Sequence, residues 1–355
     1  METMDNMIKY CAGLQASDLF IRANAKPHVR VHGLIHELDF PELTPDESRE
    51  LVYGKMNGRQ IEEFERHYEM DLSFSVPDVT RIRGSIYMQR GTVGMVLRLI
   101  PLEIPSLEQL GMPAALEEFT KARNGLILVT GPTGSGKTTT LAAMIDLINR
   151  TRPVNIVTIE DPIEFVHRDK MAILSQREVG IDTENFGEAL RRVLRQAPDV
   201  ILIGELRDVE TMNVALQAAE TGHLVFATIH TSSAAETLDR LSNMFPPHER
   251  SLLWLRLSLT LRGVVSQKLV RRADGLGRVA GVEIMIATPT ISMQLETGKS
   301  DEIYSQIRQG GLESYWGMQT MNQCLVRYFK AGVINQEEAL ANSGNFNEIK
   351  QLLRK

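Results

Sequence analysis

The sequence GPTGSGKT occupies residues 131–138, where three glycines are separated by small residues and a lysine–threonine pair closes the run. Glycines at this spacing let successive backbone N–H groups turn toward one centre, which is how proteins cradle phosphate groups. The apolar run 126–129 before it predicts a strand, and the amphipathic stretch 138–149 after it predicts a helix, whose N-terminus favours anions. This loop in this context predicts a nucleoside triphosphate site.

The residues of the loop have separate expected roles. Lys137 would place its charge on the β- and γ-phosphates, and the Thr138 hydroxyl would bind Mg²⁺. ATP and Mg²⁺ are therefore the expected cofactors. The predicted nucleotide-binding residues are Gly131, Pro132, Thr133, Gly134, Ser135, Gly136, Lys137, Thr138 and Thr139.

Hydrolysis of a bound triphosphate also needs a carboxylate to polarise water, and two acidic groups follow predicted core strands. Glu205 follows the apolar run 200–203 and Gly204, at the strand end where ligands bind in such sheets. We expect Glu205 to be the general base and to meet Mg²⁺ directly or through water. Glu160 and Glu164, which follow a second strand, are expected to orient water or neighbouring groups.

Two further residues lie close to these predicted strand ends. His230 ends the predicted strand 224–229, where it could report on the γ-phosphate, although a lone histidine is as often structural. Arg207 lies two residues past Glu205 and is expected to make a subunit contact. We include His230, but not Arg207, among the predicted catalytic residues.

The elements that must position these residues change in character near residue 100. Before it, the segment 72–76 alternates apolar and polar residues, and so does 81–86, with Arg81 and Arg83 on one face. With a return strand at 93–100, these segments predict a small α+β domain built on an antiparallel sheet. Helices are expected after Thr44 and Asn57.

Beyond residue 125, continuous apolar runs alternate with helix-length amphipathic segments, which predicts a mostly parallel sheet covered by helices on both faces. Asn185 with Glu188, and Ser233 with Glu236, have the spacing of helix capping boxes. The predicted organisation is an N-terminal domain (1–100), a proline-containing linker (101–113), an α/β core (114–288) and a helical C-terminal subdomain (289–355).

The composition narrows the class of protein. The chain has 355 residues, with 39 Lys and Arg against 45 Asp and Glu, and a net charge of −6. This acidic balance argues against a protein that coats nucleic acid. Cys11 and Cys324 are too few for a four-cysteine zinc site. The N-terminus lacks the apolar core of a signal peptide, and no apolar run approaches the ~20 residues of a membrane helix, so we expect a soluble cytoplasmic protein.

Several motifs together resemble the secretion-type ATPases, and among them the type IV pilus retraction motors of the PilT/PilU group. The phosphate loop is followed by TIEDPIEF (158–165), GELRD (204–208) and TGHLVFATIHT (221–231). The N-terminal SDLF (17–20) and the arginine-containing run 81–98 are also similar to that group. The resemblance covers nearly the whole chain, and details such as residues 194–200 favour the PilU side.

The resemblance implies a PAS-like N-terminal domain, a RecA-like ATPase domain and a homohexamer with sites between domains. Arg81, Arg83 and Arg98 match the family's arginines that reach the phosphates, and Arg90 matches less well. It also implies ATP-driven pilus retraction and twitching motility, with an inner-membrane platform protein as a partner at the cytoplasmic face of that membrane. A paralogous retraction ATPase is a further possible partner. The chain lacks the long extra N-terminal region and the four-cysteine motif of assembly-type relatives, which points away from pilus assembly and type II secretion.

Two other functions remain open from the sequence. One is a nucleotide-gated accessory module that regulates a partner pilus motor without hydrolysing ATP itself. The other is a nucleic-acid motor, which would need a basic channel. The acidic balance disfavours the motor on nucleic acid, and we expect no nucleic-acid partner.

Overall fold

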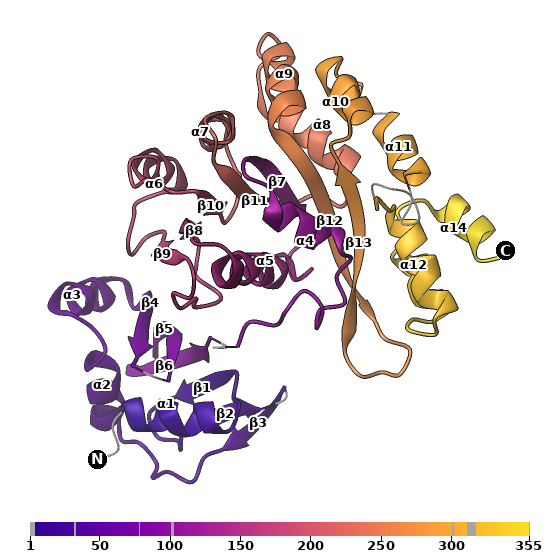
Figure 1. Cartoon of the computed structure of the whole chain (residues 1–355). Helices are drawn as coiled ribbons and strands as arrows, with labels where there is room; N and C mark the ends of the chain where they lie inside the picture. Colours follow the sequence, from indigo (N-terminus) through magenta and orange to yellow (C-terminus); the bar gives the residue numbers. More distant parts are fainter. Residues whose placement is uncertain are drawn as a thin grey trace. The chain divides into compact units, whose positions relative to one another are not determined.

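The computed structural model describes residues 4–31, 33–77, 79–100, 103–299, 302–310 and 317–354. Their contacts divide the chain into two units, whose elements are labelled in Figure 1. The first unit extends to Glu103 and includes the short segment Glu164–Val166, and the second contains Ile104–Ile163 and His167 onward. Residues 101–102 of the expected linker lie outside the described residues.

The first unit is an antiparallel six-stranded sheet with three helices; the sequence predicts the antiparallel sheet and the second and third helices, but not the first. The strands lie in the order β3-β2-β1-β6-β5-β4. The elements are α1 (Met4–Gly13), β1 (Asp18–Ile21), β2 (His28–Val31), β3 (Leu34–Glu37), α2 (Pro45–Tyr53), α3 (Gly58–His67), β4 (Glu69–Val76), β5 (Thr80–Gln89) and β6 (Thr92–Leu99).

One face of this sheet forms a core with the three helices, because apolar and polar side chains alternate along the strands and the apolar ones share that face. Ile82 of β5 and Leu97 of β6 are fully buried in a cluster that also contains Ile8 of α1 and Phe64 of α3. The expected helix starts are confirmed, since Thr44 makes a reciprocal capping box with Glu47 at the start of α2. The opposite face of the sheet carries the arginines of β5 and β6.

The second unit is built on a seven-stranded sheet in the order β13-β12-β7-β11-β10-β8-β9. The pairs from β12 to β9 are parallel, and β13 is antiparallel to β12. Its strands are β7 (Gly125–Thr130), β8 (Asn155–Glu160), β9 (Ile173–Glu178), β10 (Val200–Ile203), β11 (Leu224–Ile229), β12 (Leu261–Arg271) and β13 (Arg278–Ile286).

Helices cover both faces of this sheet, as expected for strands without polar alternation. Val225 of β11 packs in one cluster with α6, α7 and α8, whereas the next residue, Phe226, packs in another with α4 and α5. The helices named so far are α4 (Ala115–Lys121), α5 (Lys137–Thr151), α6 (Phe186–Val193), α7 (Val209–Glu220) and α8 (Ala234–Met244).

The rest of the second unit is helical apart from the β12–β13 hairpin. Helix α9 (Arg250–Thr260) leads directly into β12, and a group of short helices follows β13. The expected helical C-terminus is therefore present in the part that the structure describes. These helices are α10 (Pro289–Glu296), α11 (Ile303–Gln309), α12 (Met321–Lys330), α13 (Gln336–Ala341) and α14 (Phe346–Leu352).

Each unit contains one free cysteine, and both are buried. Burial raises the pKa of the Cys11 thiol to about 11, and burial also raises the pKa of Cys324. None of the helices in the described ranges is both long enough and apolar enough to cross a membrane.

Candidate active site

The loop after β7 has the backbone that its glycines predict. Gly134 and Gly136 have φ angles of 75° and 87°, in the left-handed region that glycine adopts without strain. Gly136 is the N-cap of α5, so the first free N–H groups of that helix face the loop. This arrangement supplies the oriented amides and the helix terminus that bind phosphate.

Lys137 is held by the loop itself. Its Nζ donates to the carbonyl oxygens of Gly131 at 2.8 Å and Pro132 at 3.1 Å. Burial lowers the pKa of Lys137, and the nearby Glu205 carboxylate opposes this effect. A phosphate group that enters the loop therefore offers the lysine a stronger, charged acceptor in exchange for two neutral carbonyls.

Strand β12 supports this loop through residues that sequence reasoning missed. The Thr130 hydroxyl donates to Ser266 Oγ at 2.8 Å, and the Thr140 hydroxyl donates to Gln267 Oε1 at 2.9 Å. Ser266 and Gln267 are buried. The adjacent polar pair Ser266 and Gln267 after the apolar residues 264–265 was the available signal, but their partners lie more than 120 residues away in the sequence.

Glu205 lies at the centre of a charged cluster beyond the carboxyl end of β10. Its Oε2 accepts from Arg207 Nε at 2.7 Å, and its Oε1 lies 3.5 Å from His230 Nε2. Arg207 also lies 3.7 Å from Asp161. The structure thus places Glu205 and His230 side by side, and it adds Arg207, whose pKa is raised mainly by its hydrogen bond to Glu205.

Close packing explains why the residue before Glu205 is a glycine. A Cβ on Gly204 would meet the Ile159 carbonyl oxygen at 3.2 Å and Glu160 Cα at 3.3 Å. The Gly204 N–H donates to that same carbonyl at 2.7 Å. The chain that follows β10 thus lies too close to β8 to leave room for a side chain. This explains why a glycine occupies the position where an aspartate often follows the strand.

Glu160 and Glu164 have different surroundings. Glu160 is 7% exposed, and its carboxylate accepts from the Thr158 hydroxyl at 2.6 Å and from Gln176 Nε2 at 3.0 Å. Glu164 belongs to the short segment that groups with the first unit, where it lies 3.7 Å from Arg83. Glu160 is therefore fixed among buried polar groups, and Glu164 is half-exposed beside a cation.

The predicted arginines lie on one face of the first unit's sheet. Arg83 of β5 pairs directly with Arg98 of β6, so both side chains project from the same face. Arg81 precedes Arg83 by two residues and shares that face. The side chains of Arg83 and Arg98 are 41% and 64% exposed.

The oxygen groups present fit a hydrated Mg²⁺ bound with a nucleotide. Thr138 offers a hydroxyl on the first turn of α5, and Glu205 offers a carboxylate whose charge acts on Lys137. The described residues contain no group of three or more His, Cys, Asp or Glu side chains that could hold a metal by themselves. A cation that takes its remaining ligands from phosphate and water is compatible with this set.

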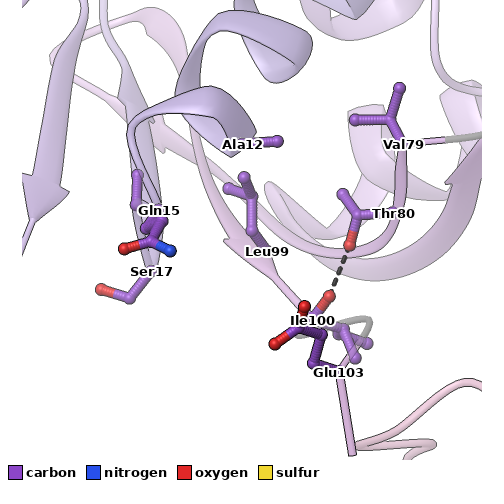
Figure 2. Close-up of a pocket in the computed structure, with 9 residues that line it drawn as sticks. Ala12, Gln15, Ser17, Val79, Thr80, Leu99, Ile100 and Glu103 are labelled. Carbon is purple, nitrogen blue, oxygen red and sulfur yellow. Dashed lines mark hydrogen bonds between the residues drawn. The ribbon is translucent and has the colours of Figure 1, made fainter.

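A separate pocket of about 450 Å³ lies in the first unit (Figure 2). It is mainly apolar, with Ala12 near the end of α1 and Leu99 at the end of β6 among its lining residues. The Thr80 hydroxyl beside it donates to the Ile100 carbonyl at 2.5 Å, the dashed line in Figure 2. None of the predicted site residues lines this pocket.

Comparisons with known proteins support the same assignment. The family described as Type II/IV secretion system protein matches residues 3–328. The type IV pilus retraction ATPase PilT of Pseudomonas aeruginosa is 46% identical over 94% of this chain and 96% of its own length. The pilus ATPase PilU of the same organism is 40% identical over 95% of this chain and 88% of its own length. By identity the chain is nearer to this PilT than to this PilU, which runs against the expected leaning toward PilU.

Solved structures agree in fold. The crystal structure of the pilus retraction motor PilT with bound ADP has a TM-score of 0.90 and 43% identity, covering 99% of this chain and all of that one. The Legionella pneumophila ATPase DotB has a TM-score of 0.80 and 30% identity, covering 95% of this chain and 93% of that one. The chain therefore belongs to the family of type II/IV secretion system proteins, and within it to the type IV pilus retraction ATPases of the PilT/PilU group.

Proposed function

We propose that this chain hydrolyses ATP and uses the energy to retract type IV pili. The observation that carries the proposal is the convergence of three groups at one edge of the parallel sheet. Lys137 follows β7, His230 follows the adjacent β11, and Glu205 follows β10, the next strand. Ligands of parallel sheets bind at this edge, so the nucleotide phosphates and the attacking water would both lie here.

The residues would divide the work as follows. Lys137 exchanges its loop carbonyls for the β- and γ-phosphates, and the loop amides hold the β-phosphate. Thr138 and Glu205 would hold Mg²⁺, which neutralises phosphate charge when bound. Glu205 polarises the attacking water, and Arg207 and His230 fix the orientation of its carboxylate. Glu160 holds the end of β8 in place, and Glu164 orients groups near the water.

The proposal for the assembly rests on the relatives. We infer a homohexamer in which Arg81, Arg83 and Arg98 donate to the γ-phosphoryl group as it leaves. The linker region would change its backbone angles as the nucleotide state changes. The partners would be an inner-membrane platform protein and, in some cells, a paralogous retraction ATPase. The motor would act in the cytoplasm, at the inner membrane.

ATP turnover by the purified full-length chain tests the enzyme proposal. We expect Lys137→Ala to abolish turnover while the oligomer still assembles, because the lysine amine bonds to carbonyls of its own loop in the described structure. We expect Glu205→Gln to lower kcat by at least about 10²-fold, the usual loss when one transition-state group is removed. Lys121→Ala is the matched control, since Lys121 is exposed and paired only with Glu118 in the described structure.

The outcomes separate the competing functions. Turnover that persists in Lys137→Ala would show that the nucleotide site lies elsewhere. Negligible and equal turnover of the wild type and Glu205→Gln, with ATP binding intact, would favour an accessory module that regulates a partner motor. Salt-sensitive binding to DNA would instead favour a nucleic-acid motor.

A further inference from the structure

A row of charged residues crosses the sheet of the first unit. Arg30 of β2 pairs with Asp18 of β1, Asp18 pairs with Arg98 of β6, and Arg98 pairs with Arg83 of β5. Directly paired residues of antiparallel strands project from the same face. Four strands therefore place three arginines and one aspartate in a single line, with Asp18 between two of the arginines.

Asp18 is buried at the centre of this row, with 5% of its surface exposed. Its Oδ1 accepts from Arg98 Nε at 3.1 Å, and its Oδ2 lies 3.2 Å from Arg30 Nε. The Ser17 hydroxyl donates to Oδ2 at 2.9 Å. A carboxylate held between two guanidinium groups in this way forms strong, charge-assisted hydrogen bonds.

The two arginines differ in what else they contact. Arg30 lies over the Phe20 ring, 5.5 Å from its centroid, and donates to the Gly33 carbonyl at 3.4 Å. Among the described residues Arg98 has Asp18 as its partner, and its side chain is 64% exposed against 36% for Arg30. Arg98 uses Nε for this bond and its side chain is largely exposed, so its two terminal amino groups can still donate to a ligand.

An arginine side chain that is already ordered before the nucleotide binds loses less entropy during the reaction. A free arginine side chain loses rotamer entropy when a ligand orders it. A donor that is already oriented does not incur this cost during the reaction. Three arginines against one aspartate leave the row with a charge of 3 − 1 = +2, so the face still attracts phosphate although it contains a carboxylate.

We propose that Asp18 is a positioning residue that orients Arg98 for the γ-phosphoryl group, with Arg30 holding the other side of the carboxylate. This inference rests on the proposed role of Arg98 in hydrolysis. Asp18 itself touches no substrate and acts only through the guanidinium.

A double-mutant cycle on the full-length chain tests this coupling, with kcat, KM and melting temperature measured for each variant. We expect Arg98→Ala to lower kcat by about 10²-fold. Asp18→Asn should lower kcat roughly tenfold and leave KM within about twofold, because the ground state binds nucleotide through the phosphate loop. In the Arg98→Ala background, Asp18→Asn should cost no further activity. Glu37→Gln, which breaks an exposed ion pair with Lys26 on the same sheet, is the control.

Asp18→Glu guards against loss of folding. It keeps the charge between the two arginines but displaces the carboxylate by one methylene, so we expect a near-normal melting temperature and a reduced kcat. If both Asp18 variants lower kcat and their effects add to that of Arg98→Ala, Asp18 is merely structural and the inference is overturned. The same holds if their kcat falls only in proportion to the loss of folded protein. If Arg98→Ala lowers turnover but neither Asp18 variant does, the inference also fails. If Arg98→Ala has normal turnover, the proposed arginine function itself fails.

Discussion

Gly136, like Gly131, is a residue of the phosphate loop where both conformation and space require glycine. Its φ is 87°, and a Cβ there would lie 2.8 Å from Gln267 Nε2. Gln267 cannot move away freely because it accepts from Thr140. The position therefore carries two penalties for any side chain, one from the backbone and one from the neighbour.

These two penalties can be separated by substitution. Gly134 has a similar φ of 75°, but a Cβ there would meet nothing within 4 Å. We expect Gly134→Ala to cost about 1–2 kcal/mol from backbone strain alone. Gly136→Ala should weaken binding of a fluorescent ATP analogue at least about tenfold more than Gly134→Ala does. Equal affinities of the two variants would show that the contact with Gln267 has no importance.

His167 makes the stability of the second unit depend on pH. Burial lowers the pKa of His167 from 6.5 to about 4, and its Nδ1 has no hydrogen-bond partner in the described structure. The folded form thus favours the neutral ring, and stability is lost as the pH falls from 6.5 toward 4 because the unfolded chain takes up the proton first.

The size of this effect follows from the shift. Between pH 7.5 and pH 5 the histidine should remove about 2 kcal/mol of unfolding free energy. His167→Gln should abolish that part of the pH dependence, measured by urea unfolding of the full chain at the two pH values. His248→Gln is the control, since His248 is 79% exposed. An unchanged slope in His167→Gln would mean that other groups cause the acid sensitivity.

At the residue scale, the sequence predicted best the groups whose local context carries the chemistry. Lys137 and Thr138 follow from a contiguous motif, and Glu205 follows from its place after a strand. Gln267 and Asp18 were missed as supporting residues because their roles depend on partners distant in the chain. Arg207 was predicted to make a subunit contact, whereas within the chain it binds Glu205.

At the element scale, one buried carboxylate links the starts of two helices. Glu283 of β13 accepts from the Ala234 N–H at the start of α8 at 2.9 Å, and from the Met321 N–H at the start of α12 at 3.4 Å. Helix α8 begins four residues after His230, whereas α12 belongs to the C-terminal helices. Glu283 is therefore a physical link between the candidate site and the C-terminal helices.

Two substitutions distinguish the hydrogen bonds of Glu283 from its charge. Burial raises its pKa, so its contribution to stability falls as the pH rises through the folded-state value. Glu283→Gln removes the buried charge but keeps only one of the two acceptor oxygens, so one N–H loses its partner, and this variant should be less destabilised at pH 7 than Glu283→Ala. Glu283→Ala leaves two buried N–H groups unpaired and should cost about 2–4 kcal/mol in urea unfolding. Equal stability of Glu283→Gln and Glu283→Ala would contradict this role for the carboxylate.

Helix starts and the central strands were predictable because their signals are local. Asn185 and Ser233 cap α6 and α8, but neither expected capping box is reciprocal, since Glu188 bonds to Arg191 and Arg192 and Glu236 bonds to Ser232. The β12–β13 hairpin was not predicted, because α9 passes into β12 without an intervening glycine or proline. Strand β3 was also missed, since its residues are all exposed and form the edge of the sheet.

At the scale of the whole molecule, the proposed ring makes a prediction about mixed assemblies. If Arg98 of one subunit serves the nucleotide of another, an Lys137→Ala subunit can supply the arginine and an Arg98→Ala subunit can supply the phosphate loop. An equimolar mixture of the two inactive variants should then regain turnover, because about one quarter of the interfaces in a randomly mixed ring contain both intact groups.

The control for this experiment removes the complementation. Mixing either variant with the double variant Lys137→Ala/Arg98→Ala should restore nothing, because no interface then contains both groups. Failure of the two single variants to complement, with subunit exchange verified by mass photometry, would indicate that Arg98 serves the nucleotide of its own chain.

Because both native cysteines are buried, thiol-reactive dyes should label the unmodified chain very little. A protonated, enclosed thiol reacts slowly with maleimides, so dyes would attach selectively to cysteines introduced at the surface. Glu37 in the first unit and Leu276 in the second are exposed positions for such a pair. Energy transfer between the dyes would then test whether the proposed nucleotide cycle changes the distance between the two labelled positions.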